Sequence, residues 1–319
     1  RGLGDVYKRQ LLRVLFFLRH QSLQMHQYRQ RAKFHRPPRH NPKPLGLKNC
    51  AYLKATISFS SSLYKITPLR YFLEFSYKGT AYHGWQRQPN ASTVQQQMED
   101  ALTTLLGKET AVLAAGRTDT GVHAKQMFAH VDLALNAEAI KQLGHRLNKF
   151  LPHDIAIKAI HPVKADAHAR FDAISRSYAY HLVPHKSPFA HELAYTFTTA
   201  LDWDAMNAAA KLLLGYTNFK CFSRSKTDVK TYDCKVTEAY WVQSDSEWIF
   251  YISANRFLRN MVRAIVGTLL DVGTGKTSLA DFQAILNSAD RTKAGSSAPA
   301  HGLFLTQVQY PNTIFETNG

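Results

Sequence analysis

From residue 69 onward, the hydrophobic pattern of the chain switches repeatedly between the period of a strand and the period of a helix. Tyr71, Leu73, Phe75 and Tyr77 recur at every second position, which is the spacing of a strand with one buried face. The stretch 92–107 instead spaces its apolar residues three and four apart, follows a Ser-Thr cap and ends in glycine, as a helix does. These elements are mixed without the strict alternation that a parallel sheet requires. We therefore predict an α+β fold with a largely antiparallel sheet flanked by helices.

The same patterns place the elements along the chain. Strands are expected at 70–78, 126–133, 154–163, 176–183, 235–242, 248–254 and 303–310. Helices are expected at 92–107, 137–151, 202–215, 257–273 and 279–286. The order of elements before and after about residue 167 is loosely similar. We therefore expect two related halves, 69–167 and 168–319, that share the sheet.

The first 68 residues have a different character. They hold 14 Lys and Arg against one acid, Asp5, whereas residues 69–319 hold 26 Lys and Arg against 22 acids, out of a formal net charge of +17. The segment has no sustained period, and prolines and cations run through 35–46. A basic RNA-binding arm and a transit peptide both fit this composition. We favour a disordered or non-native extension, translated from upstream sequence, because targeting segments are usually serine-rich and amphipathic.

Composition narrows the class of protein. The longest apolar run, 14–18, is far shorter than the ~20 residues that a membrane-spanning helix needs, so no membrane segment is expected. Three cysteines without a C-x-x-C pair predict neither a disulfide framework nor structural zinc. A cytoplasmic protein with buried thiols at Cys221 and Cys234 fits best.

Two motifs that carry well-known chemistry are incomplete. The stretch 273–278, GTGKTS, ends like a phosphate-binding loop, but Leu270 stands where the motif requires glycine and a helix precedes it where a strand should. We interpret Gly273 and Gly275 as the end of that helix. None of the fifteen histidines forms an H-E-x-x-H pattern, so the sequence predicts no metal site.

The loop 114–126, AAGRTDTGVHAKQ, carries the one acid of interest, Asp119, between two predicted elements. Aspartate before glycine is a common turn residue, and that interpretation remains open. Arg117 would favour the ionised carboxylate, which suits a nucleophile or general base. Glycosidic chemistry normally uses two carboxylates, and no second acid lies between Glu109 and Asp132. His123 is expected to be a structural hydrogen-bonding residue.

Five blocks in order resemble the tRNA pseudouridine synthase A family. RTDTGVHA at 117–124 is similar to the family's R-T-D-A-G-V-H-A signature, with Thr120 in place of the usual alanine. The other blocks lie at 76–95, 168–180, 255–273 and 298–305, and the likeness covers about residues 69–312. Several long motifs in the same order are far more specific than a single tripeptide.

The resemblance implies a pseudouridine synthase fold and an activity. Family members isomerise uridine to pseudouridine at positions 38 to 40 of the tRNA anticodon arm without metal or cofactor, and they act as homodimers. By the same likeness Asp119 is the catalytic aspartate, acting on a base that has been flipped out of the stack. Attack at C1′, attack on the uracil ring and removal of the C2′ proton all remain open as its role.

The resemblance also assigns three substrate-binding residues. Tyr178 is expected to pack on the flipped base, although Tyr180 has the same strand parity and a core position remains an alternative. Arg117 is expected to hold the displaced nucleotide. Arg263 is expected to pair with Asp119, with a solvated place on the polar face of its helix as the alternative.

Departures from the family pattern affect the predicted RNA contacts. Ser177 and Ala179 stand where many members carry arginine, and Arg259-Asn260 replaces the usual histidine pair. We expect tRNA to bind a concentrated basic stripe, whose members are Lys220, Arg224, Lys226, Lys230, Arg256 and Arg259. A non-catalytic RNA-binding protein and a nucleosidase that releases free uracil are the alternatives to the isomerase.

Overall fold

A single sheet of nine strands organises the chain in a computed structural model that describes residues 67–224, 229–244 and 246–316. The strands are β1 (Leu69–Tyr77), β2 (Leu113–Ala114), β3 (His123–Leu133), β4 (Ile155–Pro162), β5 (Ser175–Val183), β6 (Tyr195–Thr196), β7 (Val236–Ser244), β8 (Glu247–Ala254) and β9 (Leu303–Gln309). The helices are α2 (Val94–Leu106), α3 (Ala137–Phe150), α4 (Trp203–Leu212), α5 (Met261–Gly273) and α6 (Leu279–Ser288). The mixed α+β fold predicted from the sequence is confirmed.

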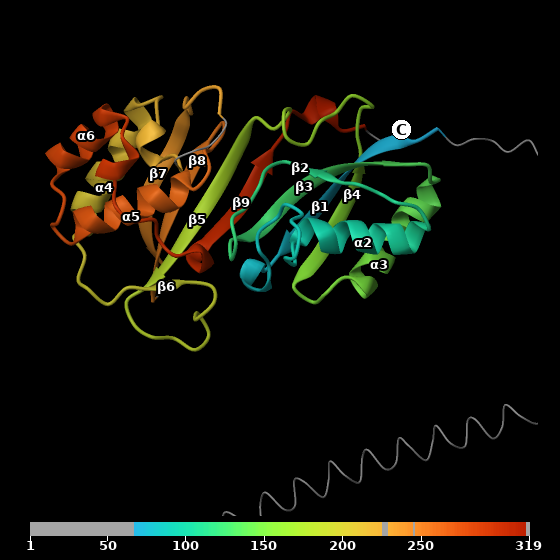
Figure 1. The fold of residues 1–319 in the computed structure, drawn as a ribbon, viewed down its shortest axis with the longest axis horizontal. Coiled ribbons are helices and arrows are strands. Elements are labelled where there is room, and N and C mark those ends of the chain that lie inside the picture. Colours follow the sequence, from blue (N-terminus) through green and yellow to red (C-terminus); the bar gives the residue numbers. More distant parts are fainter. Residues whose placement is uncertain (1–66, 225–228, 245, 317–319) are drawn as a thin grey trace, which may run out of the picture. The chain divides into compact units, whose positions relative to one another are not determined.

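The strands are ordered β4-β1-β3-β9-β5-β8-β7, and the two shortest strands lie off this path, β2 against β3 and β6 against β5 (Figure 1). All pairs are antiparallel except β3 with β9 and β5 with β6. Strand β1 lies between β3 and β4 just as β5 lies between β8 and β9. The same local order thus occurs twice, and the parallel pair β3–β9 lies where these two groups of strands meet.

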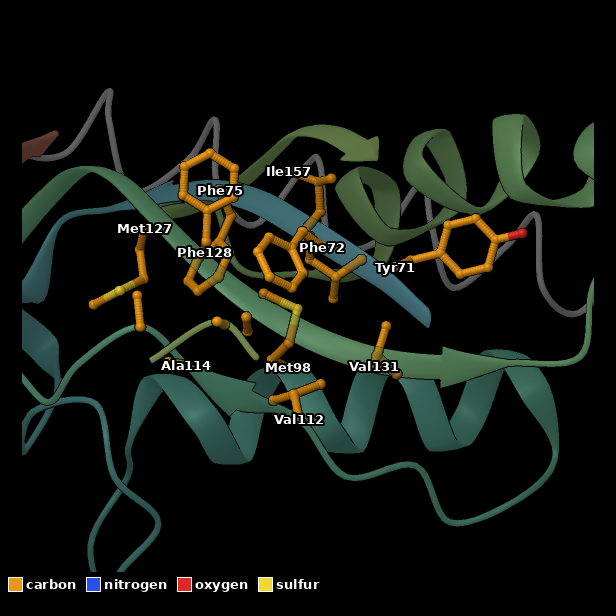
Figure 2. Packing of buried hydrophobic residues seen from close by; sticks show 14 of the residues in the cluster. Tyr71, Phe72, Phe75, Met98, Val112, Ala114, Met127, Phe128, Val131 and Ile157 are labelled. Carbon is orange, nitrogen blue, oxygen red and sulfur yellow. The ribbon is translucent and has the colours of Figure 1, made fainter. Parts of the chain in front are cut away.

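Helix α2 shows how local sequence produces one of these layers. The Thr93 hydroxyl caps its first turn by accepting from the Gln96 N–H, and Gly107 ends it in a left-handed conformation, as predicted. Its apolar stripe buries Val94, Met98 and Leu102 completely. Figure 2 shows Met98 directed from α2 toward the sheet, beside Val112 and Val131. Burying each such side chain stabilises the fold by about 1.5–3 kcal/mol, so the stripe fixes α2 against β1 and β3.

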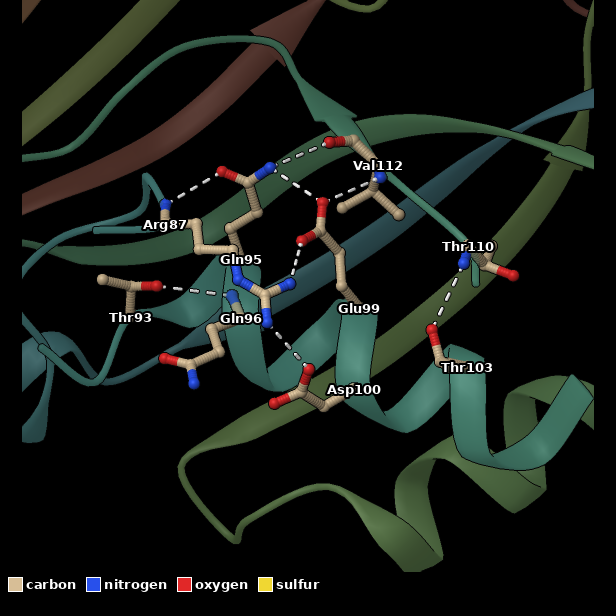
Figure 3. A network of polar contacts seen from close by, with 9 residues as sticks. All are labelled: Arg87, Thr93, Gln95, Gln96, Glu99, Asp100, Thr103, Thr110 and Val112. Carbon is tan, nitrogen blue, oxygen red and sulfur yellow. Dashed lines mark hydrogen bonds and ion pairs between the residues drawn. The ribbon is translucent and has the colours of Figure 1, made fainter. Parts of the chain in front are cut away.

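A polar network then connects α2 to β2 (Figure 3). The mostly buried Glu99 accepts from the Val112 N–H at 3.2 Å, from Gln95 at 2.8 Å and from Arg87 at 3.0 Å. Gln95 also accepts from the Arg87 N–H at 3.0 Å. Because β2 directly precedes the loop that carries Asp119, this network sets where that loop begins.

Helix α5 differs from its sequence prediction. It begins at Met261 and not at residue 257, because Asn260 has a positive φ of 66° and breaks the helical path just before it. Arg263 therefore lies in the first turn of the helix and not in its middle. Arg256, Arg259 and Asn260 all precede the helix, so they do not form a polar face on α5 together with Arg263.

Other departures are small. The predicted helix 202–215 is α4 followed by a 3-10 turn, Leu213–Gly215, and the two-residue strands β2 and β6 were not predicted because they are too short to show a period. Gly273 and Gly275 lie at the end of α5 as expected. The predicted extension 1–68, except for Thr67 and Pro68, lies outside the described residues.

None of the helices in the described part of the chain has the length and apolar character that a membrane crossing needs. Within the same residues, no group of three or more His, Cys, Asp or Glu side chains could hold a metal ion. Cys221 and Cys234 are free and buried, and burial raises the pKa of both thiols to about 11.

Candidate active site

The loop between β2 and β3 places Asp119 against the backbone of residues 79–85. The Trp85 N–H donates to the Thr118 carbonyl at 3.2 Å, and the Gly121 N–H donates to the Tyr82 carbonyl at 3.3 Å. Gly84 allows this approach, since a Cβ there would lie 2.4 Å from the Thr118 carbonyl oxygen. The two sequence blocks around Gly84 and Asp119 are therefore parts of one packed unit.

His123 holds the end of this loop in place through two hydrogen bonds. Its Nδ1 accepts from the Gly79 N–H at 2.9 Å, so the proton is on Nε2, which donates to the His301 carbonyl at 3.0 Å. Burial lowers the pKa of His123, which keeps the ring neutral, as both hydrogen bonds require. The expected structural role fits this geometry, in which His123 joins three segments that are distant in sequence.

Two guanidinium groups face the Asp119 carboxylate, which is 26% exposed. Arg263 Nη1 lies 3.6 Å from Oδ2, and Arg259 Nε lies 3.9 Å from Oδ1. Arg117, the cation nearest in sequence, is exposed and forms no hydrogen bond or ion pair with a described residue. The cations beside Asp119 thus come from α5 and the segment before it. The expectation that Arg117 is its neighbouring cation is corrected, because the fold and not sequence spacing directs these side chains.

Arg263 is held on its other side by residues 296–298. Its Nε donates to the Ala298 carbonyl at 2.7 Å, and its own carbonyl accepts from the Ala298 N–H at 2.9 Å. Gly267 lets this segment lie directly on α5, since a Cβ there would overlap the Ser296 carbonyl oxygen at 1.7 Å. Arg263 is therefore a fixed and largely shielded cation, not the solvated helix residue that the sequence left open.

Tyr178 on β5 lies near this pair. Burial raises its pKa to about 12, Arg176 acts against that rise, and the charge of Asp119 adds to it. Its ring meets Phe257 edge to face with centroids 5.0 Å apart. Tyr180, the alternative, is fully buried and donates to the Pro299 carbonyl at 2.9 Å. The structure therefore brings Asp119, Arg263 and Tyr178 together and makes Tyr180 a core residue.

Arg176 contributes to the site without having been predicted. Its guanidinium donates to the carbonyls of Ala115, Arg170, Ala173 and Asn255 at 2.6–3.2 Å. Ala115 begins the loop that carries Asp119, and Asn255 begins the segment that carries Arg259. The Arg176 side chain therefore contacts both of these segments. Burial lowers the pKa of Arg176. Its place in the family-like block 168–180, at the start of a predicted strand, was the only sequence signal for it.

The predicted basic stripe is partly described. Lys220, Arg224, Lys230 and Arg259 are exposed and Arg256 is half-buried, while Lys226 lies outside the described residues. Of these, Arg259 reaches Asp119, which the sequence did not indicate. The one sequence feature that could have drawn attention to Arg259 is that it stands where the family usually has histidine.

Comparison with known proteins places this geometry in a family. A family model described as tRNA pseudouridine synthase matches residues 75–172 and 209–311, which include Asp119, Arg259 and Arg263 but not Tyr178. The chain is 53% identical over 249 residues to tRNA pseudouridine synthase A of Porphyromonas gingivalis, covering 77% of this chain and 99% of the relative.

Two further relatives carry the same name. The protein of Bacteroides fragilis is 50% identical over 248 residues, which is 77% of this chain and 98% of the relative. That of Bacillus subtilis is 39% identical over 241 residues, which is 74% of this chain and 97% of the relative. The chain belongs to the tRNA pseudouridine synthase family. It is accordingly an enzyme of the isomerase class, and its similar relatives are the synthases designated A.

Proposed function

We propose that this enzyme isomerises uridine to pseudouridine at positions 38 to 40 in the anticodon arm of tRNA, with Asp119 as the single catalytic carboxylate and no metal or cofactor. The observation that carries the proposal is the Asp119 carboxylate, partly exposed and within 4 Å of two guanidinium groups. The names and the high identity of the relatives support the substrate.

The chemistry needs little beyond this inventory. The C1′–N1 bond breaks, the uracil turns, a C1′–C5 bond forms, and the C5 proton leaves while N1 gains one. No water enters the product, so no second carboxylate is needed to activate one. Attack at C1′, addition to the ring and removal of the C2′ proton all require an oxygen that carries negative charge, and the guanidinium groups of Arg263 and Arg259 lie within 4 Å of the Asp119 carboxylate.

The base must leave its stack before it can reach the carboxylate, which costs a few kcal/mol. In the proposal, Tyr178 packs on the flipped uracil, a role that suits its half-buried ring beside Asp119. Arg117, exposed and without a partner among the described residues, holds the displaced nucleotide. Arg263 orients the carboxylate from its fixed position on α5.

Tritium release from tRNA labelled at uridine C5 tests the chemistry. Wild-type enzyme should release tritium, and Asp119→Asn, which keeps the shape of the side chain, should release almost none. Equal release from both proteins would refute the catalytic role of Asp119. Free uracil in the product would instead indicate a nucleosidase, and binding without release an RNA-binding protein. Replacing the uridines at positions 38 to 40 by cytidine should abolish release.

The proposal also includes a cytoplasmic homodimer. The buried free thiols of Cys221 and Cys234 fit a reducing compartment. The dimer rests on the resemblance to the synthase A family. Light scattering should give a mass of twice the chain, and the mass of a single chain would contradict this part.

A further inference from the structure

The two guanidinium groups at Asp119 are held in different ways. Arg263 uses Nη1 on the carboxylate and Nε on the Ala298 carbonyl, and its side chain is only 21% exposed. Arg259 approaches Asp119 through Nε at 3.9 Å, which, like the 3.6 Å of Arg263, is an ion-pair distance longer than a hydrogen bond, and the Arg259 side chain is 58% exposed. The terminal nitrogens of Arg259 form no hydrogen bond with any described residue. Its donor-rich end is therefore available beside the reacting centre.

The backbone that carries Arg259 is nevertheless well fixed. Its carbonyl accepts from the Arg224 N–H at 3.1 Å. The next residue, Asn260, takes the left-handed conformation and donates from Nδ2 to the Ser297 hydroxyl at 2.6 Å. Phe257, two residues before Arg259, packs against Tyr178. The position of Arg259 relative to Asp119 and Tyr178 is thus set by neighbours, while its guanidinium faces solvent.

The charges around the carboxylate do not cancel. Each of the two guanidinium groups lies within 4 Å of the one carboxylate, and the three groups together leave one positive charge in excess. A second cation is not needed to pair with Asp119, because Arg263 already does so from a shielded position. The excess charge is suited to an anion that arrives with the substrate.

We propose that Arg259 binds, through its terminal nitrogens, a phosphate that flanks the target uridine. This inference rests on the proposed function and names the part of the substrate that Arg259 recognises. A nucleotide flips by rotation about its flanking phosphates, so these anions stay close to the sugar whose C1′ must reach Asp119. The planar fork of arginine matches phosphate oxygens, whereas imidazole, the family's usual group at this position, does not offer a fork. Arg259 thereby holds the sugar and phosphate while the base turns.

The proposal is tested by a double-mutant cycle on affinity. Wild-type enzyme and Arg259→Gln are titrated, by fluorescence anisotropy, with an anticodon stem-loop RNA and with two versions that carry an uncharged methylphosphonate on the 5′ or the 3′ side of the target uridine. Arg146→Gln is the matched control, because Arg146 is an exposed arginine on α3 that donates to the Leu105 carbonyl at 3.2 Å. Pseudouridine formation by the wild type on the unmodified RNA is measured first, and its absence would refute the proposed function itself.

Arg259→Gln should weaken binding of the unmodified RNA about tenfold, as expected for the loss of a charge-assisted hydrogen bond. It should also reduce the slope of log K against log salt by about 0.7–0.9, the value for one phosphate. One of the two methylphosphonates should weaken the wild type and Arg146→Gln similarly but have less than a twofold effect on Arg259→Gln.

Two results would overturn the inference. Additive losses at both phosphates would show that Arg259 contacts neither. Unchanged affinity with a slower single-turnover rate would make Arg259 a positioning residue for Asp119. Arg259→Lys separates charge from geometry, because it should restore the salt slope but not the full affinity.

Discussion

The side chains around Asp119 come from parts of the chain that are far apart in sequence. Arg263 and Arg259 belong to the first turn of α5 and the segment before it, and Tyr178 belongs to β5. Each is held by a neighbour that has no part in the proposed chemistry, such as Ala298 for Arg263 and Phe257 for Tyr178. Single substitutions should therefore separate positioning from binding.

Replacing Arg263 tests positioning. Arg263→Gln should lower kcat by about 10- to 100-fold, because it removes the ion pair that orients Asp119 and a misplacement of about 1 Å can slow a reaction about 10²-fold. KM for tRNA should change little, because Arg263 is shielded from solvent. Arg263→Lys keeps the charge but loses the Ala298 contact, so its kcat should lie between those of the wild type and Arg263→Gln. Wild-type kcat in Arg263→Gln with an unchanged circular dichroism spectrum would exclude the role.

At the level of elements, close backbone contacts position the Asp119 loop. Gly84 meets the Thr118 carbonyl, Gly267 meets Ser296, and Glu99 receives the Val112 N–H at the end of β2. These contacts hold the start and the middle of the loop and the middle of α5. Each of them can be changed without touching Asp119.

Gly84→Ala should lower kcat, because both its positive φ of 86° and the 2.4 Å approach to Thr118 resist a side chain. Gly107→Ala is the matched control, with a φ of 69° and nothing within 4 Å of the added Cβ. Gly107→Ala should destabilise the protein by about 1–2 kcal/mol, the cost of a left-handed non-glycine residue. Gly84→Ala should cost more, because the added Cβ would also overlap the Thr118 carbonyl oxygen. Only Gly84→Ala should affect kcat, and equal kcat values in the two variants would contradict the packing argument.

Glu99 and Asp100 form a second matched pair. Glu99→Ala leaves the Val112 N–H without its acceptor and should lower the free energy of unfolding by about 1–3 kcal/mol. Asp100→Ala removes only an exposed ion pair with Arg87 and should cost about 0–1 kcal/mol. Urea denaturation measures both values. Equal losses would mean that the network in Figure 3 does not stabilise the fold.

At the level of the whole molecule, buried neutral histidines make the fold sensitive to acid. Burial lowers the pKa of His130 to about 4, and Arg70 and His168 act in the same direction. Its Nδ1 accepts from the Ala169 N–H at 3.1 Å, which only the neutral ring can do. His123 follows the same logic, with a lowered pKa and an accepting Nδ1. The unfolded chain binds these protons near the ordinary histidine pKa of about 6.5, so acid favours unfolding.

Stability should therefore be complete above about pH 6.5 and should fall progressively as the pH drops toward about 4, where folded His130 also becomes protonated. His130→Asn can still accept from Ala169 but cannot titrate, so its stability should fall less steeply over this interval. His145→Asn, at an exposed position on α3, should behave as the wild type. Urea midpoints measured at several pH values give the slopes, and identical slopes for all three proteins would contradict the assignment.

Local patterns determined most of the elements, whereas packing between distant residues determined the site. Thr93, Gly107 and the apolar stripe of α2 specify that helix within one short stretch, because capping and periodicity are local properties. The start of α5 was missed because the left-handed Asn260 is set by its contact with Ser297 in another segment. The family resemblance suggested the partnership of Asp119 with Arg263, but only the tertiary structure showed Arg259 beside them and Arg117 apart. Periodicity reports which face of an element is buried; side chains meet across a site only where the chain has packed against itself.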